Sequence, residues 1–144
     1  MLFCPASQPK MFLNAPVFQP DAILFDLEDA VAYAEKDSAR DLLCEAAADV
    51  RELDGLLAAV EAEHQLPVGS VKVQCSIETA RGVLNAREIV AASPRVISLS
   101  FGAEDYTRFM GTSRSKSAQE LQFARTYLPV VAAEAGISAI DTVW

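Results

Sequence analysis

Acidic residues follow several apolar segments of this 144-residue chain, in a pattern that could form a site for a divalent cation. The segment LSFGAEDY (99–106) is the clearest case, because two acids follow directly after an apolar run and two small residues. The acids in such positions are Asp26, Glu28, Asp29, Glu78, Glu104, Asp105 and Asp141. Carboxylate oxygens without histidine favour Mg²⁺ or Mn²⁺ over zinc. The single histidine, His64, lies near the end of a predicted helix, away from these acids.

The segments that carry these acids alternate with helical segments. Apolar runs predict strands at 1–3, 22–25, 71–77, 95–101 and 139–144, and apolar residues at helical spacing predict helices at 38–64, 79–93 and 117–136. Ser117 and Glu120 have the spacing of a capping box, and Gly136 would end the last helix. The alternation predicts an α/β fold with a parallel sheet, as an open sheet or a barrel. In both architectures ligands bind at the carboxyl ends of the strands.

Glu78 and Asp105 are the strongest candidates for metal ligands, because each follows an uninterrupted apolar run. Asp26 and Asp141 lie within their predicted strands and could instead accept structural hydrogen bonds. Any single acid after a strand could equally cap the next helix or face solvent. Several strands ending in acids together favour the metal site, since a cation would relieve the repulsion between the carboxylates.

Small and basic residues supply further candidates for binding. Gly102 and Ala103 would let the backbone approach a substrate closely and offer it N–H groups. Lys36 and Arg40 have i,i+4 helical spacing and could hold the phosphate of a cofactor or an acyl carrier. They could equally form a solvated first helical turn, paired with neighbouring acids.

The composition restricts the classes of partner and the location. The net charge of −8, from 20 acids and 12 bases, argues against nucleic acid as a partner. The three cysteines have no CxxC spacing and are odd in number, which argues against a disulfide framework or a zinc site. We expect no signal peptide and no membrane span, because no apolar run approaches about 18 residues. The prediction is a soluble, cytoplasmic protein.

Seven motifs together resemble the citrate lyase beta subunit and its wider group, the HpcH/HpaI aldolases with the malyl-CoA and citramalyl-CoA lyases. They are MLFCPAS, DAILFDLEDAV, EKDSAR, IETARGVLNAREI, SFGAEDY, RSKSAQELQFAR and AGISAIDTV, in that order along nearly the whole chain. The resemblance implies a TIM (β/α)8 barrel, incomplete in this chain, with about five of eight strands represented.

The same resemblance implies roles for particular residues. Mg²⁺ would be held by Glu78 of IET and Asp105 of GAED, with Glu28 and Asp29 of DLED as catalytic residues beside the metal-bound waters. Glu104 would join Gly102 and Ala103 in contacting the substrate.

The activity implied by the resemblance is that of a carbon–carbon lyase. A citryl thioester, carried by an acyl carrier protein or by CoA, would give an acetyl thioester and oxaloacetate. The alternatives are a malyl-CoA or citramalyl-CoA lyase, and a non-catalytic, truncated remnant. A homo-oligomer and the alpha and gamma subunits of citrate lyase are the further partners implied.

The chain also departs from the family pattern. Members carry an arginine on a strand between the DLED helix and the IET strand, and this chain has no such strand. Residues up to about Ala47 resemble the helix after DLED, whereas ADVRELDGLL (48–57) resembles a helix two strand units later. We therefore expect residues 1–144 to form a single partial barrel domain, with a gap or deletion near 46–49 and a missing C-terminal part.

Overall fold

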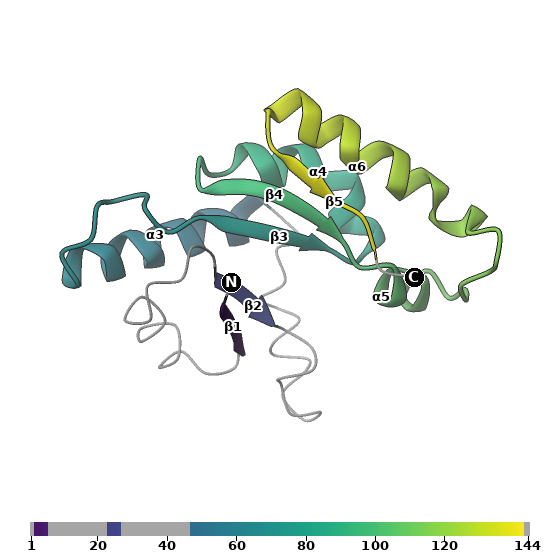
Figure 1. Ribbon diagram of the computed structural model, residues 1–144, viewed down its shortest axis with the longest axis horizontal. Helices are drawn as coiled ribbons and strands as arrows, with labels where there is room; N and C mark the ends of the chain where they lie inside the picture. The colour runs from purple at the N-terminus through teal and green to yellow at the C-terminus, as the bar shows by residue number, and fades with distance from the viewer. Residues whose placement is uncertain (1, 6–22, 27–46, 143–144) are drawn as a thin grey trace.

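The computed structural model describes the backbone of residues 2–5 and 23–26 and the continuous segment 47–142 (Figure 1). Strands and helices alternate along that segment. The elements are β1 (Leu2–Pro5), β2 (Ile23–Asp26), α3 (Ala47–Glu63), β3 (Val73–Ile77), α4 (Ala80–Ala91), β4 (Val96–Phe101), α5 (Ala103–Phe109), the 3₁₀ helix η3 (Gln119–Leu121), α6 (Gln122–Ala135) and β5 (Ser138–Ile140).

All paired strands among the described residues are parallel. Strand β1 pairs with β2, and β3, β4 and β5 form a second sheet in that order. Strand β2 approaches β3, with Cα atoms of the two strands within 8 Å of one another. The crossovers consist of helices, α4 between β3 and β4 and the segment from α5 to α6 between β4 and β5. The predicted α/β class with parallel strands is confirmed.

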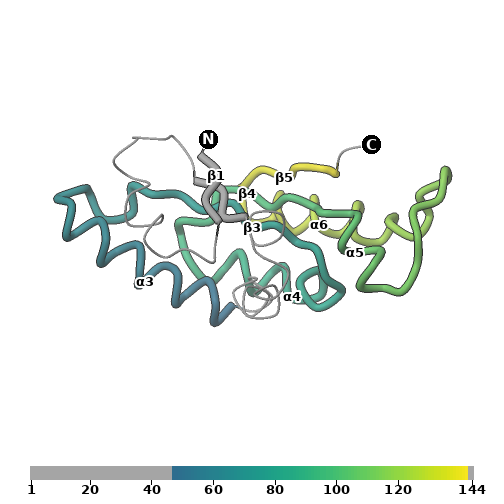
Figure 2. The backbone as a smooth tube through the Cα atoms, turned by 90° about the horizontal axis from the view of Figure 1, so that it is seen from below, coloured from purple at the N-terminus to yellow at the C-terminus, as the bar shows by residue number. Residues whose placement is uncertain are grey.

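The helices cover one face of the three-stranded sheet (Figure 2). Alternate residues of β3 point to that face, namely Val73, Cys75 and Ile77, and all three are buried. They pack in one apolar core with Leu99 and Phe101 of β4 and with residues of α3, α4 and α6. Cys75 is 2% exposed, so it packs as a small apolar residue.

The opposite face of the sheet carries polar side chains. Gln74 and Ser76 of β3 alternate with the core residues, and Ser98 and Ser100 lie opposite them on β4. Ser98 Oγ donates a hydrogen bond to Gln74 Oε1 at 3.3 Å. The two strands keep this match because β4 contains an irregularity at Ile97, where the register shifts by one residue. The alternation differs from the continuously apolar strands expected from the sequence.

One helix was not predicted, and one predicted helix cap was wrong. Ala103–Phe109 form helix α5, with Gly102 as its N-cap, in a segment for which the sequence predicted no element. Ser117 does not cap the next helix, since Ala118 holds the N-cap position of η3 with a left-handed backbone. Glu120 instead accepts hydrogen bonds from the backbone N–H and the hydroxyl of Ser115, at 2.8 and 2.7 Å. These bonds lower the pKa of Glu120.

The remaining helix predictions agree with the structure where it describes them. Thr79 caps α4 by accepting a hydrogen bond from the Gly82 N–H at 3.0 Å. Gly136 ends α6 in the left-handed conformation, at φ 69°. The part of the first predicted helix before Ala47 lies outside the described residues. Among the described residues no helix is both long and apolar enough to cross a membrane.

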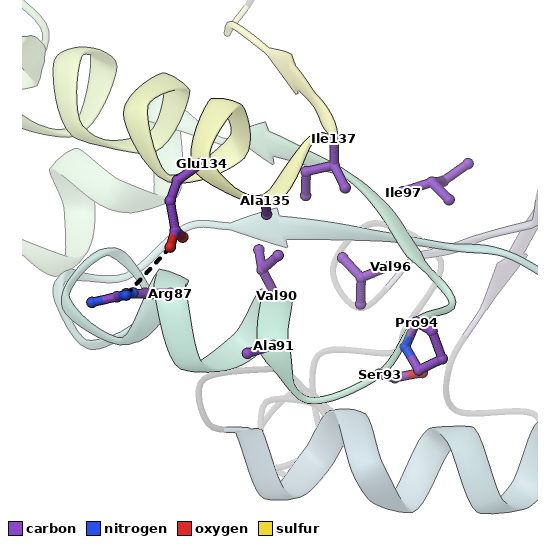
Figure 3. A pocket seen from close by; sticks show the side chains of 10 residues that line it. All are labelled: Arg87, Val90, Ala91, Ser93, Pro94, Val96, Ile97, Glu134, Ala135 and Ile137. Atoms are coloured by element: carbon purple, nitrogen blue, oxygen red, sulfur yellow. Dashed lines mark hydrogen bonds and ion pairs between the residues drawn. The ribbon is translucent and has the colours of Figure 1, made fainter.

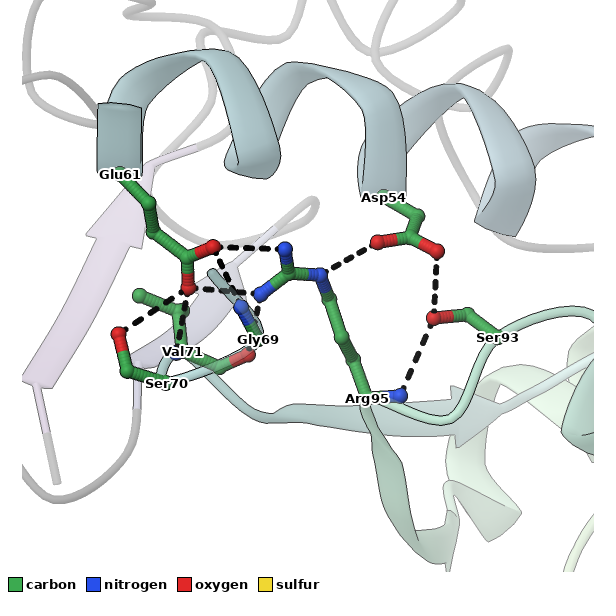
Figure 4. A network of polar contacts seen from close by, with 7 residues as sticks. All are labelled: Asp54, Glu61, Gly69, Ser70, Val71, Ser93 and Arg95. Carbon is green, nitrogen blue, oxygen red and sulfur yellow. Dashed lines mark hydrogen bonds and ion pairs between the residues drawn. The ribbon is translucent and has the colours of Figure 1, made fainter. Parts of the chain in front are cut away.

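A buried ion pair joins α3 to the amino ends of β3 and β4 (Figure 4). The Arg95 guanidinium, immediately before β4, donates to both carboxylate oxygens of Glu61 at 2.7 Å. The two side chains are 3% and 0% exposed. Glu61 also accepts from the backbone N–H groups of Gly69 and Val71, at 2.7 and 2.8 Å.

Further polar contacts complete the network around Arg95. Asp54 of α3 accepts from Arg95 Nε and from the Ser93 hydroxyl, the latter at 2.9 Å. The hydrogen bond from Arg95 lowers the pKa of Asp54. The hydrogen bonds from Arg95 outweigh burial and lower the pKa of Glu61 from 4.5 to about 2. The network therefore holds α3 and the loop after it against the start of the sheet.

Replacing Arg95 with methionine should lower the free energy of unfolding by about 3–5 kcal/mol, because Glu61 would remain buried without its counter-ion. Urea unfolding followed by circular dichroism measures this loss. Arg87→Met is the matched control, since Arg87 pairs with Glu134 at the surface, with side chains 73% and 58% exposed. Its cost should stay below about 1 kcal/mol. Equal losses in the two variants would contradict the assigned importance of the buried pair.

The stability of the chain should fall in acid because Glu61 is protonated. The pKa of Glu61 is lower in the folded chain, so the stabilisation is complete above pH 4.5 and is lost as the pH falls toward 2. The expected loss is up to about 3 kcal/mol, measured by urea unfolding across that range. Glu61→Gln should remove this part of the pH dependence, whereas Glu63→Gln, at an exposed neighbouring position, should keep it. If the free energy of unfolding of Glu61→Gln depends on pH as in the wild-type protein, Glu61 is not the group responsible.

Candidate functional site

Glu78 and Gly102 lie side by side where β3 and β4 end. The register pairs Ile77 with Phe101, the last residues of the two strands, so the next residue of each strand is a neighbour of the other. Gly102 N–H continues the pairing by donating to the Ile77 carbonyl at 3.1 Å. Glu78 is the only residue between β3 and Thr79, the N-cap of α4. Its backbone is therefore fixed by a strand on one side and a helix on the other.

The side chain of Glu78 occupies the place that a side chain at position 102 would need. A Cβ atom at Gly102 would lie 2.6 Å from Glu78 Cγ, 2.7 Å from Oε1 and 2.8 Å from Cδ. The backbone conformation of Gly102, with φ −94° and ψ 92°, is one that any residue can adopt. Glycine is thus required here for close approach and not for its backbone conformation. Gly102 was predicted as a residue that admits substrate, and the structure places it against Glu78.

A hydroxyl from the same strand orients Glu78. Ser76 precedes Glu78 by two residues and so points to the same face of the sheet. Its Oγ donates to Glu78 Oε1 at 2.6 Å. The carboxylate thus accepts a hydrogen bond from Ser76 and fills the space that a side chain at position 102 would need.

Glu104 and Asp105 lie in the first turn of α5, and both contact arginines. Asp105 is 24% exposed and pairs with Arg108, one turn further along α5, at 2.5 Å. Glu104 is 68% exposed and pairs with Arg114 at 2.7 Å. The predicted adjacent acids therefore point to different partners. Asp105 is the more enclosed of the two, which suits it better than Glu104 as a ligand.

Asp141 and Ala103 have structural contacts in this part of the chain. Asp141 follows β5, outside the strand in which the sequence placed it, and accepts from Arg125 Nε at 3.0 and 3.1 Å. Partial burial raises the pKa of Asp141, but the hydrogen bonds from Arg125 outweigh it and lower the pKa. Ala103 is buried, and its N–H donates to Thr142 Oγ1 at 3.4 Å. The Ala103 N–H, which was predicted to face substrate, therefore donates to Thr142 instead.

Several predicted site residues lie outside the described residues. They are Glu28 and Asp29 of DLED and the bases Lys36 and Arg40. Asp26 ends β2 and pairs in register with Pro5. Within the described part of the chain no three acids, cysteines or histidines gather as a metal site would.

The sequence interpretation missed the counter-ions and the orienting hydroxyl. Arginines pair with Glu104, Asp105 and Asp141, which lie near these strand ends. A cation is therefore not the only means by which the repulsion between these acids is relieved. The i,i+3 spacing of Asp105 and Arg108 could have indicated their pair. The period of two along a strand could have indicated Ser76 beside Glu78.

A groove elsewhere on the domain is separate from these acids (Figure 3). It lies between α4, α6 and the start of β4, and its lining is mostly apolar, including Val90, Val96 and Ile137. The Arg87–Glu134 ion pair lies at this groove. Because β4 begins here and ends at Phe101, just before Gly102, the groove and Glu78 lie at opposite ends of the strand.

The arrangement defines a parallel α/β domain with carboxylates at its strand ends, and comparison with known proteins identifies its family. The model of the HpcH/HpaI aldolase/citrate lyase family matches residues 1–51 and 43–144. The chain belongs to this family.

Individual relatives are similar to the chain over its whole length. Citrate lyase subunit beta of Leuconostoc mesenteroides subsp. cremoris is 37% identical over 189 aligned residues, which cover 100% of this chain and 63% of the relative. A more distant relative, the (3S)-malyl-CoA thioesterase of Cereibacter sphaeroides, is 30% identical, with 100% of this chain and 62% of the relative covered. The chain thus spans less than two thirds of the length of these relatives.

A solved structure shares the fold. The citrate lyase beta subunit of Mycobacterium tuberculosis, in complex with oxaloacetate and magnesium, superposes with a TM-score of 0.52. It is 28% identical, and the match covers 99% of this chain and 77% of that structure.

Gly102→Ala should lower the free energy of unfolding by about 1–3 kcal/mol, because the new methyl group would displace Glu78. A double-mutant cycle with Glu78→Ala, measured by urea unfolding, tests the cause. In the Glu78→Ala background the same change should be nearly neutral. Gly55→Ala, in α3 with no atom within 4 Å of the added Cβ, is the control and should stabilise by up to about 1 kcal/mol. A cost at Gly102 that persists without the Glu78 side chain would contradict the close contact.

Proposed function

We propose that this chain is the metal-binding part of a TIM (β/α)8 barrel that cleaves a citryl thioester into an acetyl thioester and oxaloacetate. The observation that carries the proposal is the placement of Glu78 across Gly102, with Asp105 in the first turn of the following helix. This arrangement lies at the carboxyl ends of parallel strands, where barrel enzymes bind their substrates. Membership of the HpcH/HpaI aldolase/citrate lyase family supports the same reaction class.

The chemistry of Glu78 and Asp105 fits a magnesium ion. Mg²⁺ commonly binds proteins through one or two carboxylates and keeps several water ligands. A pair of carboxylates on neighbouring strand ends is enough for such a site, so a cluster of three acids is not required. The M. tuberculosis relative in complex with oxaloacetate and magnesium supports this choice of ion.

The ion pair between Arg108 and Asp105 does not prevent this role. Arg108 is 66% exposed, so its guanidinium can turn into solvent and release the Asp105 carboxylate. An exposed pair of this kind contributes at most about 1 kcal/mol. A divalent ion held by two carboxylates and by substrate oxygens outweighs that loss.

The proposed reaction is a retro-Claisen cleavage. The bond between the thioester α-carbon and the carbinol carbon breaks, the hydroxyl loses its proton, and oxaloacetate forms as the ketone. The α-carbon retains the bonding electrons and takes up a proton, which gives the acetyl thioester. Bound Mg²⁺ would act as a Lewis acid toward the hydroxyl and carboxylate oxygens of the citryl group.

The chain's own residues have separate tasks in this proposal. Glu78 and Asp105 hold the ion, and Gly102 leaves room for the Glu78 carboxylate. Glu28 and Asp29 are proposed as catalytic residues beside the metal-bound waters, and Glu104 and Ala103 as substrate contacts. Lys36 and Arg40 are proposed to hold the phosphate of the acyl carrier or of CoA.

The partners and the completeness of the barrel are also proposals. The two family matches overlap at 43–51, close to the gap predicted near 46–49. The alignment with the Leuconostoc relative runs over 189 residues, 45 more than the 144 of this chain. Both observations support a missing internal segment. A homo-oligomer and the alpha and gamma subunits are proposed because the relative's name describes it as a subunit.

The mass of the purified protein tests whether the internal segment exists. A mass several kilodaltons above 15.5 kDa would support a chain with the additional strands. A mass near 15.5 kDa would favour the non-catalytic remnant, which predicts metal binding without turnover.

A second candidate, a malyl-CoA or citramalyl-CoA lyase, is favoured by the similarity to the malyl-CoA thioesterase. Incubation of the purified protein and Mg²⁺ with the citryl, malyl and citramalyl thioesters separates the candidates by their products. Oxaloacetate from the citryl thioester supports the first proposal. No cleavage of the three thioesters would contradict both lyase proposals.

Asp105→Asn should lower the rate of thioester cleavage by at least about 100-fold, because the substitution removes one charged ligand of the ion. Oxaloacetate release, coupled to NADH oxidation by malate dehydrogenase, measures the rate. Asp141→Asn is the control, because Asp141 pairs with Arg125 and has no proposed role in the site. Its rate should stay within about threefold of the wild-type rate. Full activity in Asp105→Asn would remove Asp105 from the reaction.

A further inference from the structure

The polar face of the sheet continues directly into the proposed metal site. Ser76 and Glu78 are consecutive residues on that face, since residues two apart in a strand point the same way. Ser76 Oγ lies 2.6 Å from Glu78 Oε1 and donates to it. A hydroxyl–carboxylate bond of this length is a charge-assisted hydrogen bond, about twice as strong as a neutral one.

The absence of a side chain at Gly102 leaves the space that Glu78 fills. Glu78 Cγ, Cδ and Oε1 all lie within 2.8 Å of the point where a Cβ atom of residue 102 would stand. The hydroxyl and the glycine come from neighbouring strand ends, and Glu78 Oε1 lies close to both. Freezing a glutamate side chain costs up to about 2 kcal/mol of conformational entropy. Here the Glu78 side chain loses this conformational freedom when the chain folds, before any ligand binds.

We propose that Ser76 is a positioning residue that holds the Glu78 carboxylate in the orientation required to bind the divalent cation. The inference rests on the proposed function, since it concerns the same ion. The Ser76 bond engages Oε1 and fixes the rotation of the carboxylate, so that its orientation toward the ion is set before binding. Groups that orient a metal ligand in this way commonly change metal affinity by 10–100-fold.

Ser100 offers a matched comparison on the neighbouring strand. It lies directly opposite Ser76 in the register of β3 and β4, and both residues are half-buried. The Ser100 hydroxyl forms no hydrogen bond with any residue that the structure describes. The two serines therefore share strand position and burial but differ in contact with Glu78.

Calorimetric titration of the purified protein with Mg²⁺ tests the inference. Ser76→Ala should weaken Mg²⁺ binding by 10–100-fold, whereas Ser100→Ala should change it by less than about twofold. Ser76→Thr keeps the hydroxyl and should bind within about threefold of the wild-type protein. Urea unfolding of each variant provides the second readout, and Ser76→Ala should unfold at a lower urea concentration than Ser100→Ala, because only Ser76 donates to a carboxylate.

Each contrary result has a distinct meaning. If the wild-type protein and Ser76→Ala bind Mg²⁺ equally well, the positioning role is wrong and the metal site stands. Equal weakening in Ser76→Ala and Ser100→Ala would also overturn it, because the effect would then come from general loosening of the sheet. If the wild-type protein binds no Mg²⁺, the proposed function fails and the inference fails with it.

Discussion

The pairing register of β3 and β4 is the constraint on which the rest of the structure depends. It brings Glu78 beside Gly102, and it places the polar residues of both strands on one face and the apolar residues on the other. The irregularity at Ile97 allows both of these arrangements. A register shift of one residue moves every following side chain of a strand to the opposite face of the sheet. Without it, the serines of β4 would point into the core formed with the helices.

Charge around the strand ends is balanced within the protein itself. The arginines that pair with Glu104, Asp105 and Asp141 come from three positions, in α5, in the loop before η3 and in α6. In each pair at least one side chain is half exposed or more, so each pair contributes little to stability. Glu78 accepts a hydrogen bond from Ser76 of β3 and lies beside Gly102 at the end of β4. The proposed site thus combines a carboxylate that accepts from a strand residue with a carboxylate that pairs with an exposed arginine.

The sequence predicted the class of fold, and it singled out Glu78 and Asp105 as candidate ligands without indicating their contacts. Apolar runs and helical spacing identified β3, β4, α4 and α6, since these patterns follow directly from burial. Helix α5 was missed because its seven residues are too few to show a clear period. The Arg95–Glu61 pair joins residues 34 positions apart, and such contacts depend on the tertiary fold. Ser76 was overlooked because a serine in a strand has no distinctive pattern of its own.

The buried Arg95–Glu61 pair has a consequence for how this protein can evolve. The pair joins α3 to the amino ends of the strands, whereas Glu78 and Asp105 lie at the carboxyl ends. The most enclosed ionic interaction among the described residues is therefore remote from the residues proposed to act on substrate. Substitutions that alter the choice of substrate can then accumulate at one end of the sheet while the other end maintains the folded state.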